Sequence, residues 1–176
     1  MALGKDYVNQ QCSMARALEV VGERWTLLVV RDALYGVRRY NDFLVHLGIP
    51  RAVLATRLQT LTEAGVLEKR LYQQAPPREE YVLTESGKAL WPVVRALSSW
   101  GLDHLPGTLP MRLFVHAECG TEVDAYGICP ACSLPVPPEE TEMRPGEGLD
   151  TETDNPVDRV FLTPRRLLRP VEADRV

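Results

Sequence analysis

Apolar residues recur at intervals of three and four through most of the first half of the chain. This spacing predicts amphipathic helices, because residues at i, i+3, i+4 and i+7 share one helical face. Glycine, which readily takes the left-handed conformation that ends many helices, follows several of these runs. We predict helices over residues 13–21, 24–35, 40–47, 51–64 and about 85–105, with Ser13 and Thr84 as N-caps of the first and last.

Two strand-forming stretches follow the fourth predicted helix. Residues 66–72 and 80–83 flank a polar turn that contains Pro76 and Pro77, and proline cannot donate a hydrogen bond to a β-ladder. A helix followed by a hairpin is the order of a winged helix. The pattern predicts a mainly α chain with a small β-wing, an α+β winged helix-turn-helix.

The second half of the chain has a different composition. Residues 112–135 indicate a short β-hairpin module, whereas residues 136–158 are rich in proline and acid and lack aromatic side chains, which is typical of disorder. Residues 159–170 form a short apolar and basic patch with no role assigned. We expect a DNA-binding and dimerisation domain over 1–107, a zinc-ribbon-like module over 108–136, and an acidic, proline-rich, disordered tail over 137–176.

The predicted helix over residues 51–64 has two contrasting faces. Leu54, Leu58 and Leu61 form an apolar face that can hold the helix on its domain. A helix that reads a major groove needs short or hydrogen-bonding side chains on the opposite face. Those positions are Ala52, Thr56 and Gln59, with Thr60 beside them and Arg51 at the helix start.

Basic residues flank this helix and are expected to contact phosphates. They are Arg38, Arg39, Lys69, Arg70 and Arg78. For any single arginine, a solvated surface position without a DNA contact is an equally good interpretation. The formal net charge is −4, but acidic residues are concentrated after residue 107. Because affinity for DNA depends on local phosphate contacts, an acidic appendage does not exclude a DNA-binding first half.

Three of the four cysteines cluster near a histidine, in the pattern His116-x2-Cys119-x9-Cys129-x2-Cys132. Two ligand pairs separated by a hairpin-length insert suit a structural, tetrahedral Zn²⁺ site, and four protein ligands leave no open position for catalysis. Ser133 occupies a place where zinc ribbons usually carry glycine. The alternative is a degenerate ribbon without metal, or a partly oxidised cluster.

Many scattered positions over residues 10–105 resemble HxlR-type bacterial transcriptional regulators, which are similar in architecture to the MarR group. They include Cys12, Val21-Gly22-Glu23-Arg24-Trp25-Thr26-Leu27-Leu28, Arg31-Asp32, Gly36, Arg39-Tyr40-Asn41-Asp42-Phe43, Gly48-Ile49, Arg57-Leu58, Gly65-Val66-Leu67, Tyr72, Pro76-Pro77-Arg78, Leu83-Thr84-Glu85-Ser86-Gly87 and Trp100-Gly101. The resemblance implies a homodimer built from the first and last long helices and a palindromic operator. Glu79 departs from the family pattern, which more often has an apolar residue there.

The same resemblance implies that Cys12 is a redox or electrophile sensor. Its place just before a helix N-terminus favours the thiolate. The alternative is a buried, inert cysteine that packs against the first helix, because burial is the commonest state of cysteine.

The leading hypothesis is a sequence-specific DNA-binding regulator, a repressor that acts as a homodimer and responds to a small-molecule or electrophile effector. The alternative is a protein-interaction module of the transcription machinery that reads no bases. The sequence contains no phosphate loop, nucleophile elbow or HExxH motif, so we do not expect an enzyme. It also lacks an apolar stretch of membrane-spanning length and a secretory h-region, which predicts a soluble, cytoplasmic protein.

Overall fold

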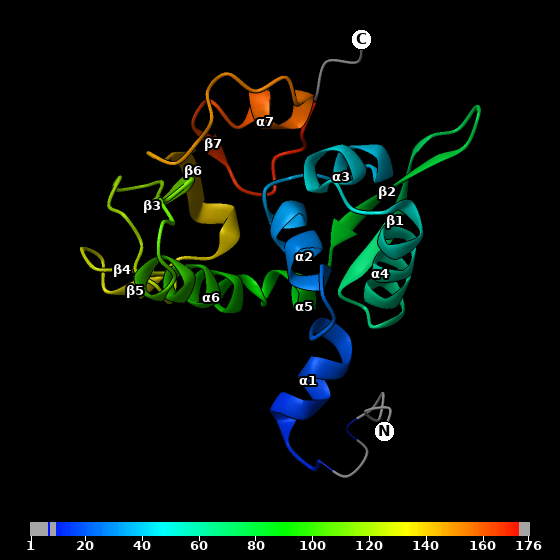
Figure 1. Cartoon of the computed structure of the whole chain (residues 1–176), viewed down its shortest axis with the longest axis horizontal. Helices are drawn as coiled ribbons and strands as arrows, with labels where there is room; N and C mark the ends of the chain where they lie inside the picture. Colours follow the sequence, from blue (N-terminus) through cyan, green and yellow to red (C-terminus); the bar gives the residue numbers. More distant parts are fainter. Residues whose placement is uncertain (1–6, 8–9, 173–176) are drawn as a thin grey trace.

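The computed structural model describes residue 7 and residues 10–172. Its first half is a winged helix (Figure 1), which confirms the predicted α+β class. The two strands of the wing pair antiparallel, with Leu67 opposite Leu83 and Gln73 opposite Arg78. The elements are α1 (Ser13–Val21), α2 (Thr26–Leu34), α3 (Tyr40–Leu47), α4 (Arg51–Glu63), β1 (Leu67–Gln73) and β2 (Arg78–Leu83).

The helix predicted over residues 85–105 is broken into α5 (Glu85–Lys88) and α6 (Trp91–His104). Thr84 caps α5 as predicted, because its hydroxyl accepts a hydrogen bond from the Gly87 amide at 3.2 Å. Pro92 lies in the first turn of α6, where its missing N–H is not needed. At α1 the predicted cap is wrong by one residue: the Cys12 sulfur, and not the Ser13 hydroxyl, accepts from the Ala15 amide at 3.3 Å.

The C-terminal half contains two small sheets. Strands β3 (Arg112–His116), β6 (Thr141–Pro145) and β7 (Arg165–Arg166) form an antiparallel sheet in that order. Strands β4 (Ile128–Cys129) and β5 (Leu134–Pro135) form a hairpin. The short helices are η1 (Pro138–Glu140) and α7 (Pro156–Val160). The sheet therefore joins a strand of the expected zinc-ribbon module to two strands of the expected tail.

Residues 137–172 consequently differ from the disorder predicted for the tail. Val157, Phe161 and Leu167 are buried and belong to the hydrophobic core. Two of these lie in the apolar and basic patch to which the sequence assigned no role. A few well-spaced apolar residues suffice here because the winged helix supplies the other side of the core.

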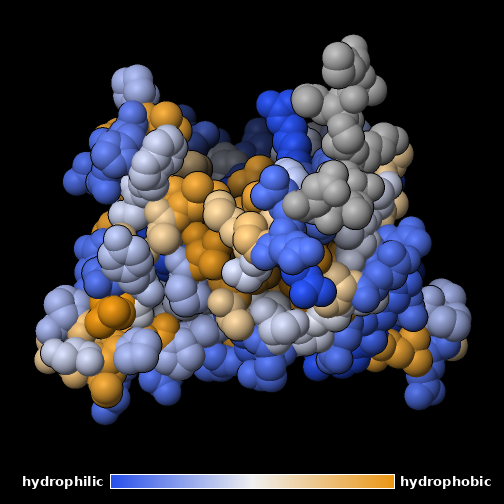
Figure 2. Space-filling view, turned by 90° about the horizontal axis from the view of Figure 1, so that it is seen from below, coloured by the Kyte–Doolittle hydropathy of each residue, from blue (hydrophilic) through white to orange (hydrophobic). Residues whose placement is uncertain are grey.

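Aromatic side chains join the two halves of the chain. The Phe114 ring of β3 lies 5.1 Å from the Trp91 ring and 6.0 Å from the Tyr35 ring, centroid to centroid. Phe161 also meets Tyr35 in an edge-on arrangement, with the ring centroids 5.8 Å apart. Apolar area also remains exposed on the side of the molecule seen in Figure 2. On α6, Trp100 is 53% exposed, whereas Trp91 at the start of the helix is buried.

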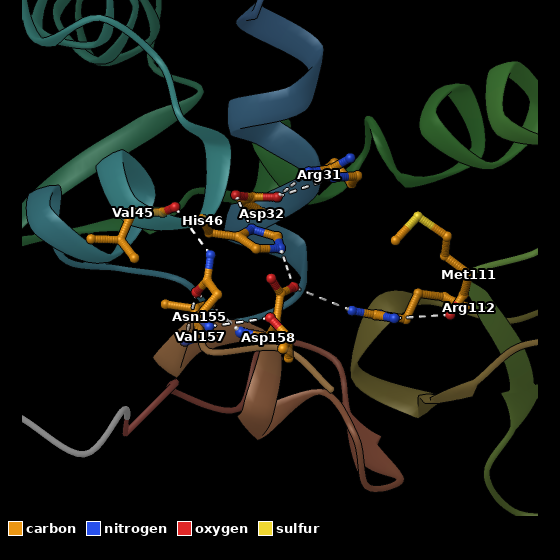
Figure 3. Close-up of polar contacts among 10 residues, drawn as sticks. Arg31, Asp32, Val45, His46, Met111, Arg112, Asn155, Val157 and Asp158 are labelled. Carbon is orange, nitrogen blue, oxygen red and sulfur yellow. Dashed lines mark hydrogen bonds and ion pairs between the residues drawn. The ribbon is translucent and has the colours of Figure 1, made fainter. Parts of the chain in front are cut away.

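A network of charged groups crosses the same boundary (Figure 3). The fully buried Asp32 accepts two hydrogen bonds from Arg31, at 2.8 and 3.0 Å, and pairs with His46 Nδ1 at 2.6 Å. His46 Nε2 lies 3.2 Å from Asp158 of α7, and Arg112 of β3 lies 3.8 Å from that carboxylate. Helices α2 and α3 are thereby linked to the C-terminal half by polar contacts as well as by the core.

Candidate nucleic-acid interface and metal cluster

Helix α4 presents the two faces expected from its sequence. Leu54, Leu58 and Leu61 are fully buried. The start of the helix is fixed to α3, because the Tyr40 hydroxyl donates to the carbonyl of Arg51 at 2.9 Å. The opposite positions are exposed, with Thr60 half-buried beside them; the exposed ones are Arg51, Ala52, Thr56 and Gln59.

Polar groups on this exposed face bond mainly along the helix itself. The Thr56 hydroxyl donates to the carbonyl of Ala52 at 3.0 Å, and the Gln59 amide nitrogen donates to Glu63 at 2.8 Å. Both contacts join residues four apart on one helical ridge. The face is thus an ordered, solvent-exposed strip of small and amide side chains, with the shape that a major groove admits.

The wing carries alternating basic and acidic side chains. Lys69 Nζ lies 3.1 Å from Glu79, and this hydrogen bond raises the pKa of Lys69. Arg70 Nε donates to Glu80 at 3.0 Å, while Arg78 is exposed at the start of β2. Glu79, the departure from the family pattern, therefore balances a lysine, and part of the positive charge of the wing is compensated within the hairpin.

Arg38 and Arg39 lie in different surroundings. Arg39 stacks on the ring of Tyr72, with its guanidinium carbon 4.6 Å from the ring centroid. Arg38 Nη2 donates to the carbonyl of Leu168 at 2.9 Å, and its Nη1 lies 3.6 Å from Glu80. Burial lowers the pKa of Arg38. The sequence pattern predicted the same role for these two adjacent arginines. They differ in that the Arg38 guanidinium contacts both Leu168 and Glu80.

The sequence interpretation missed Glu80. This carboxylate is 8% exposed and meets both Arg38 and Arg70. The sequence offers one signal. Glu80 lies among strand-forming residues, and a carboxylate that a strand buries needs a cation beside it. The identity of that cation depends on the fold, because Arg38 is far away in sequence.

The four predicted metal ligands come together. His116 Nδ1 and the sulfurs of Cys119, Cys129 and Cys132 all lie within 4.8 Å of one another. The Cys119 sulfur lies 3.4 Å from His116 Nδ1, 3.5 Å from the Cys129 sulfur and 3.7 Å from the Cys132 sulfur. A tetrahedron with metal–sulfur bonds of about 2.3 Å has sulfur–sulfur edges of about 3.8 Å. The separations therefore fit a tetrahedral ion.

The backbone supports this geometry with two matching turns. The Gly120 amide donates to the carbonyl of His116 at 2.7 Å, and the Ser133 amide donates to the carbonyl of Cys129 at 2.8 Å. Both donors adopt left-handed conformations, with φ of 73° and 57°. Ser133 thus adopts the conformation for which glycine is the usual residue, and the second turn forms despite that substitution.

Neighbouring groups also suit a cation. His116 Nε2 lies 3.8 Å from Glu140 and 3.9 Å from Glu118, and carboxylates near the outer nitrogen of a ligating imidazole are typical of metal sites. Hydrogen bonds with Thr121 lower the pKa of the Cys119 thiol to about 6, whereas hydrogen bonds with Cys119 and Cys129 raise the pKa of the Cys132 thiol to about 12. Of these two, Cys119 more readily supplies the thiolate, the form that binds metal.

Cys12 is exposed, in contrast to the alternative of a buried thiol. Its sulfur caps α1, and the surrounding hollow is lined by residues that include Arg16 and Tyr7. In the part of the chain that the structure describes, the other three cysteines belong to the metal cluster.

Within residue 7 and residues 10–172, no helix combines the length and the apolar character that a membrane span needs.

Comparison with known proteins agrees with this geometry. The model of the HxlR-like helix-turn-helix family matches residues 20–108. An HTH-type transcriptional regulator of Mycobacterium tuberculosis, Rv3095, is 41% identical over 138 residues, which is 77% of this chain and 87% of the relative. The regulator YdeP of Bacillus subtilis is 32% identical over 103 residues, which is 56% of this chain and 80% of YdeP.

Two solved structures are also similar. The transcription factor PA1607 superimposes with a TM-score of 0.59 at 35% identity, covering 71% of this chain and 88% of PA1607. The redox regulator HypR in its reduced form superimposes with a TM-score of 0.50 at 29% identity, covering 54% of this chain and 95% of HypR. The family match and these relatives together show that the chain belongs to the HxlR-like helix-turn-helix family of DNA-binding transcriptional regulators.

Proposed function

We propose that the protein is a repressor that binds a palindromic operator as a homodimer, with α4 in the major groove and the wing on the flanking backbone. The observation that carries the proposal is the exposed strip of Ala52, Thr56 and Gln59, backed by three buried leucines. In this arrangement the exposed strip reads base edges, and basic side chains beside it contact phosphates and fix the register.

Exposed apolar side chains on α1 and α6 support the homodimer. Met14 is 70% exposed, and Leu97 and Trp100 are each 53% exposed. A contiguous exposed apolar patch marks an interaction site, and Figure 2 shows apolar area exposed on one face of the molecule. A two-fold dimer that covers it would present two copies of α4 to successive turns of one DNA face.

A structural Zn²⁺ ion is the second part of the proposal. The ion would be held by His116, Cys119, Cys129 and Cys132. When bound, it would cross-link two turns that have little core of their own. The role is architectural because all four tetrahedral positions are filled by side chains of this chain.

The division between reading and positioning contacts can be tested with two variants. Operator sequences are first selected from a random duplex pool; an enriched palindrome is expected. Gln59→Ala should then lose about 1–3 kcal/mol on the selected duplex and little on random DNA, because it removes a base contact. Arg39→Ala should weaken both duplexes alike and lower the salt slope by about 0.9, because it removes a phosphate contact.

Fluorescence anisotropy at several salt concentrations measures both effects. Equal losses of Gln59→Ala on selected and random duplexes would refute base reading by α4. A monomeric protein that enriches no sequence would instead favour a protein-interaction module.

We propose further that Cys12 makes the protein responsive to oxidants or electrophiles, which the exposed thiol at a helix N-terminus supports. Hydrogen peroxide at low concentration should release the wild-type protein from its selected duplex, and a thiol reductant should restore binding. Cys12→Ser should bind in both conditions. Because the cluster cysteines also react with oxidants, zinc content is measured in parallel. Release of Cys12→Ser from DNA with its zinc retained would contradict the sensor role.

A further inference from the structure

Residues 167–171, here called the strap, cross the turn between α2 and α3. The Leu168 amide donates to the carbonyl of Leu34 at 2.8 Å, and the Val171 amide donates to the carbonyl of Gly36 at 2.9 Å. Leu167 and Val171 are buried in the core. The strap is thus fixed by backbone bonds and by apolar side chains to the segment that leads into the helix-turn-helix.

The approach between strap and turn is close enough to require glycine. Gly36 has a φ of +94°, and a Cβ built on it would lie 1.8 Å from the carbonyl oxygen of Arg169. No side chain fits that space without moving the strap backbone. Position 36 therefore offers a way to displace the strap without changing any charge.

Arg38 connects this strap to the wing. One guanidinium nitrogen donates to the carbonyl of Leu168, and the other faces Glu80 of β2. The backbone carbonyl of Arg38 also accepts from the Tyr81 amide at 2.8 Å. Glu80 in turn binds Arg70 of β1. Both strands of the wing are therefore tied through one carboxylate to Arg38, and Arg38 is tied to the strap.

The strap itself is anchored in the C-terminal sheet. It follows β7, which pairs with β6, and β6 pairs with β3. The segment around α7 is a second attachment of the C-terminal half to the winged helix. There the Asn155 side chain donates to the carbonyl of Val45 of α3 at 3.1 Å, and Asp158 faces His46 of α3. The strap is consequently fixed to the β3–β6–β7 sheet, which is itself attached to α3 through the segment around α7. It can therefore hold the wing in a defined orientation.

We propose that Arg38 is a positioning residue and not a phosphate contact: through Arg38 and Glu80, the strap fixes the wing relative to α4 and so raises affinity for DNA. The inference rests on the proposed DNA binding. It predicts that any change that separates strap from wing weakens DNA binding, whether or not it changes the charge near the DNA.

Four full-length variants test it. Arg38→Lys keeps the positive charge but replaces the planar two-armed group with one ammonium. Gly36→Ala displaces the strap and leaves all charges in place. The third variant combines the two. Gly107→Ala is the matched control, because Gly107 also has a left-handed φ, +76°, but has no neighbour within 4 Å of the added Cβ.

We expect Arg38→Lys and Gly36→Ala each to lower affinity for the selected duplex by about tenfold. The double variant should be no weaker than the weaker single one, because both changes break one connection. The salt slope should stay at the wild-type value, and Gly107→Ala should bind as the wild type does. Wild-type affinity of Arg38→Lys, multiplied losses in the double variant, or a loss in Gly107→Ala equal to that in Gly36→Ala would overturn the proposal.

Hydrogen exchange of the free protein separates this inference from the proposed function. Arg38→Lys should speed exchange of the wing amides, including that of Tyr81, and leave those of α4 unchanged. This result is independent of any duplex, so it is readable even if no operator is found. Unchanged wing exchange in Arg38→Lys would also refute the positioning role, and it does not depend on whether Gly36→Ala folds.

Discussion

Replacing Cys129 with serine is expected to abolish the proposed zinc binding and to lower the thermal midpoint of unfolding by about 10 °C. Cys129 is the fully buried cysteine of the cluster, and its sulfur lies 3.5 Å from that of Cys119. Structural zinc sites contribute about 10–16 kcal/mol of apparent binding free energy in isolated fingers. Retaining even about 3 kcal/mol of this in the whole chain corresponds to roughly 6–12 °C at this size.

Elemental analysis and scanning calorimetry measure the two effects. Wild-type protein purified without chelators should contain close to one zinc per chain, and Cys12→Ser is the control because Cys12 lies outside the cluster. A wild-type chain without metal, or a Cys129→Ser variant with the wild-type midpoint, would show that the four side chains form no structural site.

The second large effect is expected at Asp32. Asp32→Asn should lower the free energy of unfolding by about 3 kcal/mol, because the fully buried carboxylate loses its charge-assisted hydrogen bonds, while Arg31, 29% exposed, keeps part of its hydration. The carboxylate is fully buried and meets Arg31 and His46 (Figure 3). Urea denaturation followed by tryptophan fluorescence measures the change.

Glu147→Gln, in the loop after β6, provides the comparison, since it removes the same charge from an exposed position. Surface substitutions of this kind stay within about 0.5 kcal/mol. If the two variants were equally stable, the network joining α2, α3 and α7 would contribute nothing measurable.

Local signals predicted the winged helix well. Helix α3 has the predicted bounds, and α4 begins directly after Pro50 as expected from proline at a helix start. The break before α6 was less visible. It occurs near Gly87, where an added Cβ would lie 2.2 Å from the carbonyl oxygen of Val66. That close approach depends on how α5 meets the end of α4, which no local pattern specifies.

The C-terminal half was harder to predict because its order comes from distant partners. Composition indicates disorder for residues 136–158, yet β6 completes a sheet begun by β3. The clustering of His116, Cys119, Cys129 and Cys132 could be predicted because their spacing is local within each turn. The different surroundings of Arg38 and Arg39 were not, because Leu168 lies 130 residues away from Arg38.

The strap has a consequence for how the protein matures. Ribosomes produce a chain from its N-terminus, so the helix-turn-helix and hairpin leave the exit tunnel long before residues 167–171. During that interval Arg38 has no Leu168 carbonyl to bind, and β3 has no β6 to pair with. A nascent chain would therefore hold a folded α4 with a wing that the strap has not yet fixed, so the proposed DNA affinity would reach its full value only after residues 167–171 have been translated.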